Sequence, residues 1–179
     1  MNLLIVSGSL SEGSNSRKMA GHLKQFWDAG GLTPDFIDLR DFDLAICDGG
    51  AAYEKPDVAK LRMRFEAADG IVFAVPIYNF DVNAAVKNVI ELVGGTMQDK
   101  VAGFLCAAGG GGSYMSVMAI ANSLMLDFRT VILPRFVYAT RDSFDGETVS
   151  DPIRERIEIF GAEMAKLTQA VSASQNEGS

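Results

Sequence analysis

The chain has 179 residues, which is enough for one domain with a complete hydrophobic core. Its formal net charge of −7 and sequence pI of about 4.7 argue against a nucleic acid or a membrane surface as partner, because both bind basic faces. No apolar run is long enough to span a membrane and no export signal is visible in the first residues, so we expect a cytoplasmic protein.

The first predicted element is a strand at residues 2–6, and a loop of glycines and hydroxyl side chains follows it at residues 7–16. A helix comes next, because apolar residues recur at the spacing of one helical face: Met19, Leu23, Phe26 and Trp27. Strand, small polar loop and helix in this order are typical of phosphate sites, where loop N–H groups and the positive end of the helix dipole bind the anion.

The alternative interpretation of this loop is a plain turn whose serines cap the helix. Neither the Walker A pattern nor the dinucleotide glycine pattern is present. If the loop does bind phosphate, Ser9, Ser14 and Ser16 offer hydroxyl donors. No Lys or Arg precedes Arg17, so we expect backbone and hydroxyl groups to carry the binding.

The middle of the chain alternates predicted strands and helices. Residues 35–39 alternate polar and apolar side chains, as a strand near a sheet edge does, and an acidic loop extends from 40 to 54. Pro56 occupies the first position of a helix that Gly70 ends. Residues 71–75 are apolar throughout, which predicts a central parallel strand covered on both faces.

Two more loops of unusual composition follow the central strands. Residues 76–81 read Pro-Ile-Tyr-Asn-Phe-Asp, and residues 109–113, four glycines and a serine, follow a second buried strand at 101–107. A helix predicted at 114–126 is apolar nearly all round. Because one apolar stripe is enough to cover a sheet, we expect this helix to form a subunit interface in a homodimer or homotetramer.

The last predicted elements are a short strand and a long helix. Residues 130–133 form the strand, which residues 136–138 extend beyond Pro134. A helix starts at Asp151 and carries an apolar stripe as far as Val171. We expect one domain of residues 1–171, followed by a disordered polar tail at 172–179.

The alternation of strands and helices predicts an α/β protein: a flavodoxin-like three-layer sandwich with a five-stranded parallel sheet in the order 2-1-3-4-5. The three unusual loops then emerge at one edge of the sheet, beside the point where the strand order reverses. We expect one elongated pocket there, with a phosphate at the first loop and a planar group between residues 76–80 and 109–113. Taken singly, the glycines are also consistent with a flexible loop, and Tyr78 and Phe80 with core or rim packing.

The residues of the three loops also occur as recognisable motifs. The first loop carries Gly8-Ser9-Leu10 followed by Gly13-Ser14, residues 76–79 read Pro-Ile-Tyr-Asn with Lys87-Asn88 farther on, and residues 108–113 are glycine-rich. In this order they resemble the NADPH-dependent FMN reductases of the flavodoxin-like superfamily, whose first two motifs read approximately G-S-x-R-x-x-S-x-N and P-E-Y-N…K-N. Two positions differ, since Ser11 replaces the usual arginine and Ile77 the glutamate.

The resemblance implies FMN bound without a covalent bond. Its phosphate would contact Ser9, Ser14, Asn15 and Ser16, and its ring would contact the second and third loops. The resemblance and the reading of the three loops as one pocket together give the positions that we expect to bind the flavin: Ser9, Ser11, Ser14, Asn15, Ser16, Pro76, Ile77, Tyr78, Asn79, Phe80, Gly109, Gly110, Gly111, Gly112 and Ser113.

The implied activity is that of an FMN-dependent NAD(P)H oxidoreductase. NADPH or NADH would pass hydride to flavin N5, and a quinone, free flavin, azo compound or metal oxyanion would then take the electrons. Such chemistry requires no catalytic side chain and no metal, which agrees with a site made of Ser, Gly, Tyr and Asn. We keep two alternatives, a flavodoxin-type electron carrier without a nicotinamide site and a flavin-binding sensor without reductase activity.

Overall fold

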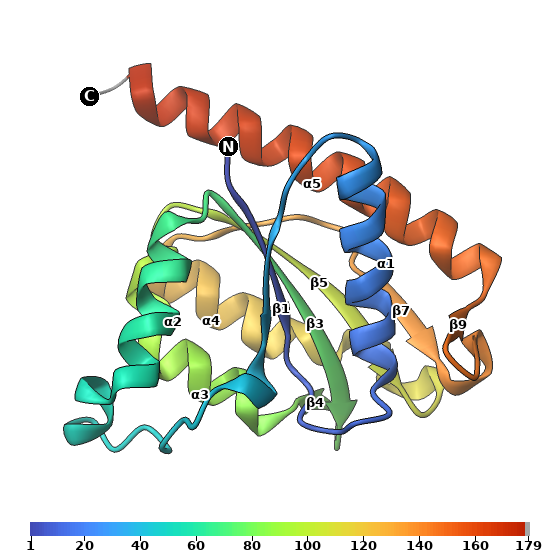
Figure 1. Cartoon of the computed structure of the whole chain (residues 1–179), viewed down its shortest axis with the longest axis horizontal. Coiled ribbons are helices and arrows are strands. Elements are labelled where there is room, and N and C mark those ends of the chain that lie inside the picture. The colour runs from blue at the N-terminus through green and yellow to red at the C-terminus, as the bar shows by residue number, and fades with distance from the viewer. Residues whose placement is uncertain (178–179) are drawn as a thin grey trace.

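A twisted parallel sheet forms the middle layer of the computed structural model, which describes residues 1–177 (Figure 1). Its strands are β1 (Leu3–Ser7), β2 (Asp35–Asp38), β3 (Gly70–Tyr78), β5 (Val101–Ala108), β6 (Val131–Ile132) and β7 (Val137–Thr140). They lie in the order β2-β1-β3-β5-β6, and β7 also pairs with β5. This order confirms the predicted 2-1-3-4-5 arrangement.

The fifth strand of the predicted sheet is divided into β6 and β7. β6 pairs with the start of β5, at Val101, and β7 pairs with its end, from Leu105 to Ala108. Pro134, which has no N–H to donate to a ladder, and Arg135, with a φ of +60°, lie between the two pieces. The division brings the end of β7 to the same sheet edge as the ends of β1, β3 and β5.

Helices cover both faces of the sheet. One face is covered by α1 (Asn15–Ala29) and α5 (Asp151–Glu177), which bury Trp27 and Phe160 against the strands. The other face is covered by α2 (Pro56–Ala67), α3 (Ala84–Val93) and α4 (Met118–Phe128) (Figure 1). β1, β3 and β5 are buried on both sides, which explains their uninterrupted apolar sequences.

Two helix boundaries differ from those that the sequence predicts. The predicted helix at 114–126 begins only at Met118, because Gly111–Val117 forms a 3₁₀ segment in which Ser113 has a non-helical φ of −102° and ψ of 27°. Glycines resist helix formation, so the run before Tyr114 delays the start of α4. Where the sequence predicts a disordered tail over 172–179, α5 continues to Glu177, and residues 178–179 lie outside the described residues.

The predicted loop at 76–81 is largely a hairpin. β3 continues to Tyr78 and pairs antiparallel with β4 (Asp81–Val82), so only Asn79 and Phe80 form the turn. A second hairpin, β8 (Phe144–Asp145) with β9 (Thr148–Val149), lies beside α1. Short 3₁₀ segments complete the structure at Leu39–Asp41, Ala51–Glu54, Gly94–Met97, Gly111–Val117 and Arg141–Ser143.

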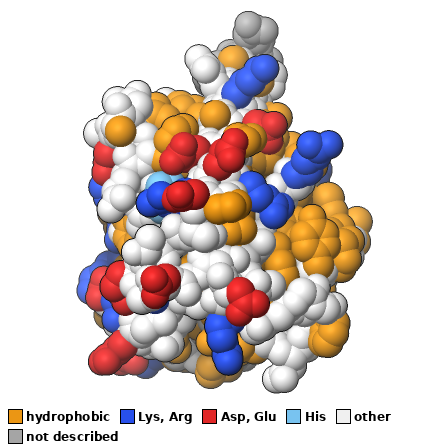
Figure 2. Space-filling model, turned by 90° about the vertical axis from the view of Figure 1, so that its right-hand side faces the viewer, with side chains coloured by type: hydrophobic (Ala, Val, Ile, Leu, Met, Phe, Trp, Pro, Cys, Tyr) orange, Lys and Arg blue, Asp and Glu red, His pale blue; other side chains and the backbone are white. Residues whose placement is uncertain are grey.

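The surface mixes charges of both signs with local apolar areas. On the face in Figure 2, acidic and basic side chains alternate over most of the view, and hydrophobic side chains gather along one side. Over residues 1–177, no helix combines the length and the apolar character that crossing a membrane requires.

Candidate active site

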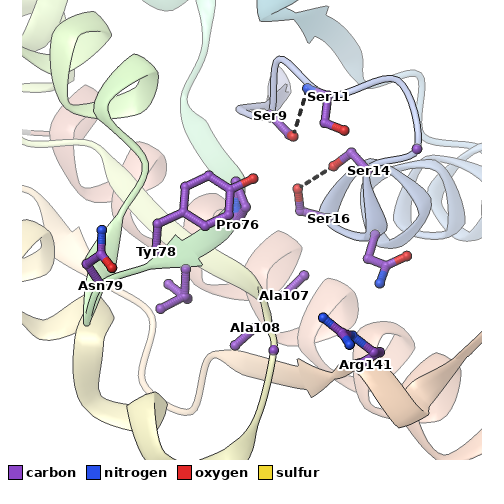
Figure 3. Close-up of a pocket in the computed structure, with 14 residues that line it drawn as sticks. Ser9, Ser11, Ser14, Ser16, Pro76, Tyr78, Asn79, Ala107, Ala108 and Arg141 are labelled. Atoms are coloured by element: carbon purple, nitrogen blue, oxygen red, sulfur yellow. Dashed lines mark hydrogen bonds between the residues drawn. The ribbon is translucent and has the colours of Figure 1, made fainter.

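A cavity of about 560 Å³ opens at the carboxyl ends of β1, β3 and β5, where the strand order reverses (Figure 3). Ten of the fifteen positions predicted for a flavin line it: Ser9, Ser11, Ser14, Asn15, Ser16, Pro76, Ile77, Tyr78, Asn79 and Gly109. The lining residues that the sequence did not predict are Gly13, Ala107, Ala108 and Arg141. The cavity therefore joins all three unusual loops with the end of the last strand.

The first loop ends in a buried pair of hydroxyl groups at the start of α1. Ser14 is the N-cap residue, and its Oγ accepts a hydrogen bond of 3.3 Å from the backbone N–H of Arg17. The Oγ atoms of Ser14 and Ser16 are 2.9 Å apart, and both side chains are buried. Capping and anion binding are compatible here, because the two hydroxyl groups share one hydrogen bond and the hydroxyl hydrogen of the serine that accepts it remains available to donate.

Arg17 fixes the course of this loop from outside the cavity. Its Nη1 donates to the carbonyl oxygens of Ser11 at 2.6 Å and Glu12 at 3.1 Å, and its Nη2 donates to that of Ser9 at 2.7 Å. Arg17 does not line the cavity. Because these three carbonyl oxygens are bound to Arg17, the loop does not present them to an anion in the cavity.

Asp38, at the end of β2, anchors Arg17 in turn. Its carboxylate accepts hydrogen bonds from Arg17 Nε at 2.8 Å and from Arg40 Nη2 at 2.8 Å. Partial burial of Asp38 favours its neutral form, but the hydrogen bonds from Arg40 and Arg17 outweigh this effect and lower the pKa of the carboxyl group. Asp38 is therefore ionised at neutral pH and holds the arginine that shapes the loop.

The opposite wall of the cavity is apolar and aromatic. Pro76, Ile77 and Tyr78 belong to the last part of β3, and Tyr78 is 55% exposed at the rim. Figure 3 shows the Tyr78 ring across the cavity from Ser14 and Ser16. This wall offers a flat surface against which a ring can pack.

The glycine-rich loop is held by Tyr138 of β7, which the sequence did not identify. Tyr138 Oη donates to the carbonyl oxygen of Gly110 at 2.6 Å, so Ser113 Oγ, at 2.8 Å from Oη, is the donor in the second bond. The ring of Tyr114 also packs edge-on against Tyr138. The glycine-rich loop is thus fixed by side chains that do not line the cavity.

Five of the predicted positions do not line the cavity: Phe80, Gly110, Gly111, Gly112 and Ser113. Phe80 is 70% exposed at the tip of the β3–β4 hairpin. A Cβ atom added to any glycine from Gly109 to Gly112 would meet no atom outside its chain neighbours within 4 Å. Packing within the chain therefore does not require these glycines, and the space beside them is open to a ligand.

Among the described residues 1–177, Arg141 alone lines the cavity with a charged side chain. It begins the 3₁₀ segment Arg141–Ser143, directly after β7. The carboxyl ends of parallel strands meet at one edge of a sheet, so Arg141 could have been predicted if the sequence had shown that the last strand ends at Thr140. Within residues 1–177, no group of three His, Cys, Asp or Glu side chains is arranged to hold a metal ion.

Comparisons with known proteins agree on one family. Residues 1–144 match the family model described as NADPH-dependent FMN reductase. An NAD(P)H-dependent FAD/FMN reductase of Geobacillus thermodenitrificans (strain NG80-2) is 32% identical over 139 residues, which are 73% of this chain and 73% of that protein. An NADPH:quinone oxidoreductase of Arabidopsis thaliana is 28% identical over 137 residues, which are 71% of this chain and 70% of that protein.

Solved structures share the fold. An NADH:FMN oxidoreductase (EMOB) in its apo form superposes with a TM-score of 0.77 at 17% identity. The match covers 91% of this chain and 87% of that one.

Proposed function

Because the chain belongs to the NADPH-dependent FMN reductase family, we propose that it transfers hydride from NADPH or NADH to FMN and the electrons onward to a small acceptor such as a quinone. The relatives named above support the acceptor class, since one is named for flavin and another for quinone. The observation that carries the proposal is a single cavity that is lined by hydroxyl groups, by the cation of Arg141 and by a flat apolar wall.

The residues of the cavity fit FMN. The phosphate would be held at the start of α1 by the hydroxyl groups of Ser14 and Ser16 and by free N–H groups of the loop. The ring system would lie beside Tyr78 and Gly109, where a Cβ would meet no atom of the chain within 4 Å. The uncharged character of this end suits a largely apolar, planar ring.

When bound, FMN supplies a two-electron centre that accepts hydride from a nicotinamide and returns the two electrons to an acceptor. Reduction of a quinone to a hydroquinone balances with one hydride from the nicotinamide and one proton from water. The residues of the chain bind and orient, and none of the lining residues has to act as a nucleophile or a base. No Asp, Glu, His, Lys or Cys is among them.

We also propose that the chain assembles as a homodimer or homotetramer. Large apolar side chains are exposed on and before α4: Tyr114, Met115, Met118, Met125 and Leu126. Tyr114 and Met115 directly follow the glycine-rich loop, so an interface that includes them would lie close to the cavity.

A quinone-reduction assay tests the proposed activity. With protein that has first been stripped of any bound flavin, we expect oxidation of NADPH or NADH by a benzoquinone that requires both the protein and added FMN. Ser14→Asp places a negative charge at the proposed phosphate position and should raise the FMN concentration needed by about tenfold or more. Ser172→Asp makes the same change near the C-terminal end of α5, outside the cavity, and should leave the required FMN concentration unchanged. Oxidation that is independent of FMN would overturn the proposal.

A further inference from the structure

Arg141 is an exposed cation that lines the cavity, and the described part of the chain offers its side chain no hydrogen-bond or ion-pair partner. Figure 3 shows its guanidinium group extending into the cavity from the end of β7, on the wall that faces Ser14 and Ser16. Among residues 1–177, no hydrogen bond or ion pair joins its side chain to another group. An arginine side chain that makes no hydrogen bond or ion pair within the described residues and points into a cavity is available to bind an anionic ligand.

The other cations near the first loop are already engaged. Arg17 binds Asp38 and three loop carbonyl oxygens. Lys18 Nζ donates to Gly146 O at 2.6 Å and to Asn15 Oδ1 at 3.2 Å, and Arg40 pairs with Asp38. None of these three cations lines the cavity.

The side chains of the first loop that reach the cavity are neutral, and the molecule carries a net charge of −7. A phosphate monoester would therefore enter a site with no cation of its own loop, inside a field that repels anions. Charge-assisted hydrogen bonds from a planar guanidinium group are the usual way to offset this cost.

We propose that Arg141 is the residue that recognises the 5′-phosphate of FMN and makes the site prefer FMN to riboflavin, an assignment that rests on the proposed function. The serines and loop N–H groups would contact the phosphate from the α1 side, and Arg141 would contact it from the β7 side. The phosphate would thus be held between two elements, and its charge would be matched by a residue outside the loop motif.

The test compares the affinities of FMN and riboflavin for the full chain, measured by quenching of flavin fluorescence. Arg141→Gln should weaken FMN binding by about tenfold or more and leave riboflavin binding within about twofold. Arg141→Lys should recover part of the loss, because it keeps the charge but not the planar fork. The salt dependence of FMN binding should also become shallower in Arg141→Gln.

Arg135→Gln is the matched control, because it changes the net charge equally at an exposed position outside the cavity. It should leave the affinities of both flavins unchanged. Unchanged FMN affinity in Arg141→Gln, or an equal loss for both flavins, would overturn the assignment while leaving flavin binding itself intact. A wild-type chain that binds neither flavin would instead overturn the proposed function, and the assignment with it.

Discussion

A few side chains set the geometry of the first loop, and Asp38 is the one on which the others depend. It orients Arg17, and Arg17 holds three carbonyl oxygens of the loop. Ser11 and the other side chains of the first loop that line the cavity are uncharged, so the loop itself brings no cation to the cavity. We propose that Arg17 fixes the shape of the phosphate site and that Arg141 supplies its positive charge.

We predict that Asp38→Asn lowers the free energy of unfolding by about 2 kcal/mol at neutral pH, because it leaves a largely buried Arg17 without its counter-charge. The folded-state pKa of Asp38 is lowered, so its stabilisation is present above its ordinary pKa of 3.8 and is lost as the pH falls below that value. Urea unfolding should show the same gap between wild type and variant at about pH 7 and about pH 5, and a smaller gap at about pH 3.

Asp127→Asn is the control for this experiment, because Asp127 is exposed and has no ion pair in the described part of the chain. Its unfolding free energy should match that of the wild type at each pH. A gap for Asp38→Asn that widens as the pH falls would contradict the assignment.

Phe80 is strained in the fold. Asn79 and Phe80 have φ angles of +51° and +65°, as in the type I′ turn that favours Asn followed by Gly. Phe80 is 70% exposed, so its ring gains little by burial. We predict that Phe80→Gly raises the free energy of unfolding by about 1 kcal/mol, measured by urea denaturation. Phe80→Ala is the control, because alanine also has a Cβ and is therefore disfavoured in the left-handed conformation. Equal stability of Phe80→Gly and Phe80→Ala would count against strain at this position.

At the scale of elements, the layer of α1 and α5 packs closely on the sheet at Gly103. A Cβ on this glycine of β5 would lie 2.6 Å from Phe160 Cζ and 3.3 Å from Met164 Sδ. We predict that Gly103→Ala lowers the free energy of unfolding by about 1–3 kcal/mol through overpacking. Gly21→Ala is the matched change within α1, where a Cβ meets nothing within 4 Å. It should raise stability by about 0.5–1 kcal/mol, and a stabilising Gly103→Ala would show that α5 can move away from β5.

The elements that could be predicted from the sequence are those with unambiguous patterns. Residues 71–75 and 101–107 are apolar without interruption, and the helix after Ser14 has a clear periodic face. The segment at 114–126 is apolar on all sides, so periodicity could not locate the start of its helix. The meeting of the loops after β1, β3 and β5 could also be predicted, because the carboxyl ends of parallel strands lie at one edge of the sheet. The role of Tyr138 and the position of Arg141 could not be predicted, because the expected extension of the last strand stopped at residue 138, whereas β7 continues to Thr140.

At the scale of the whole molecule, the proposed assembly rests on the apolar side chains that are exposed on and before α4. Met115 and Leu126 are 60% and 77% exposed. We predict that light scattering at micromolar concentration gives two or four times the monomer mass of 19.2 kDa. Met115→Lys combined with Leu126→Lys should shift the mass toward that of a monomer, whereas Ile159→Lys on α5 should not. A monomeric wild type would refute the proposed interface.

The proposed function requires that the cavity holds FMN which a nicotinamide can reduce. The most direct measurement is the absorbance of the flavin band after the protein has been mixed with FMN, desalted and made anaerobic, followed by addition of NADPH and then NADH. We predict that the flavin band is retained after desalting and that at least one of the two nucleotides bleaches it. A retained band that neither nucleotide bleaches would contradict it and favour an electron carrier or a sensor. Loss of the band on desalting would contradict the claim that FMN is held as a bound cofactor.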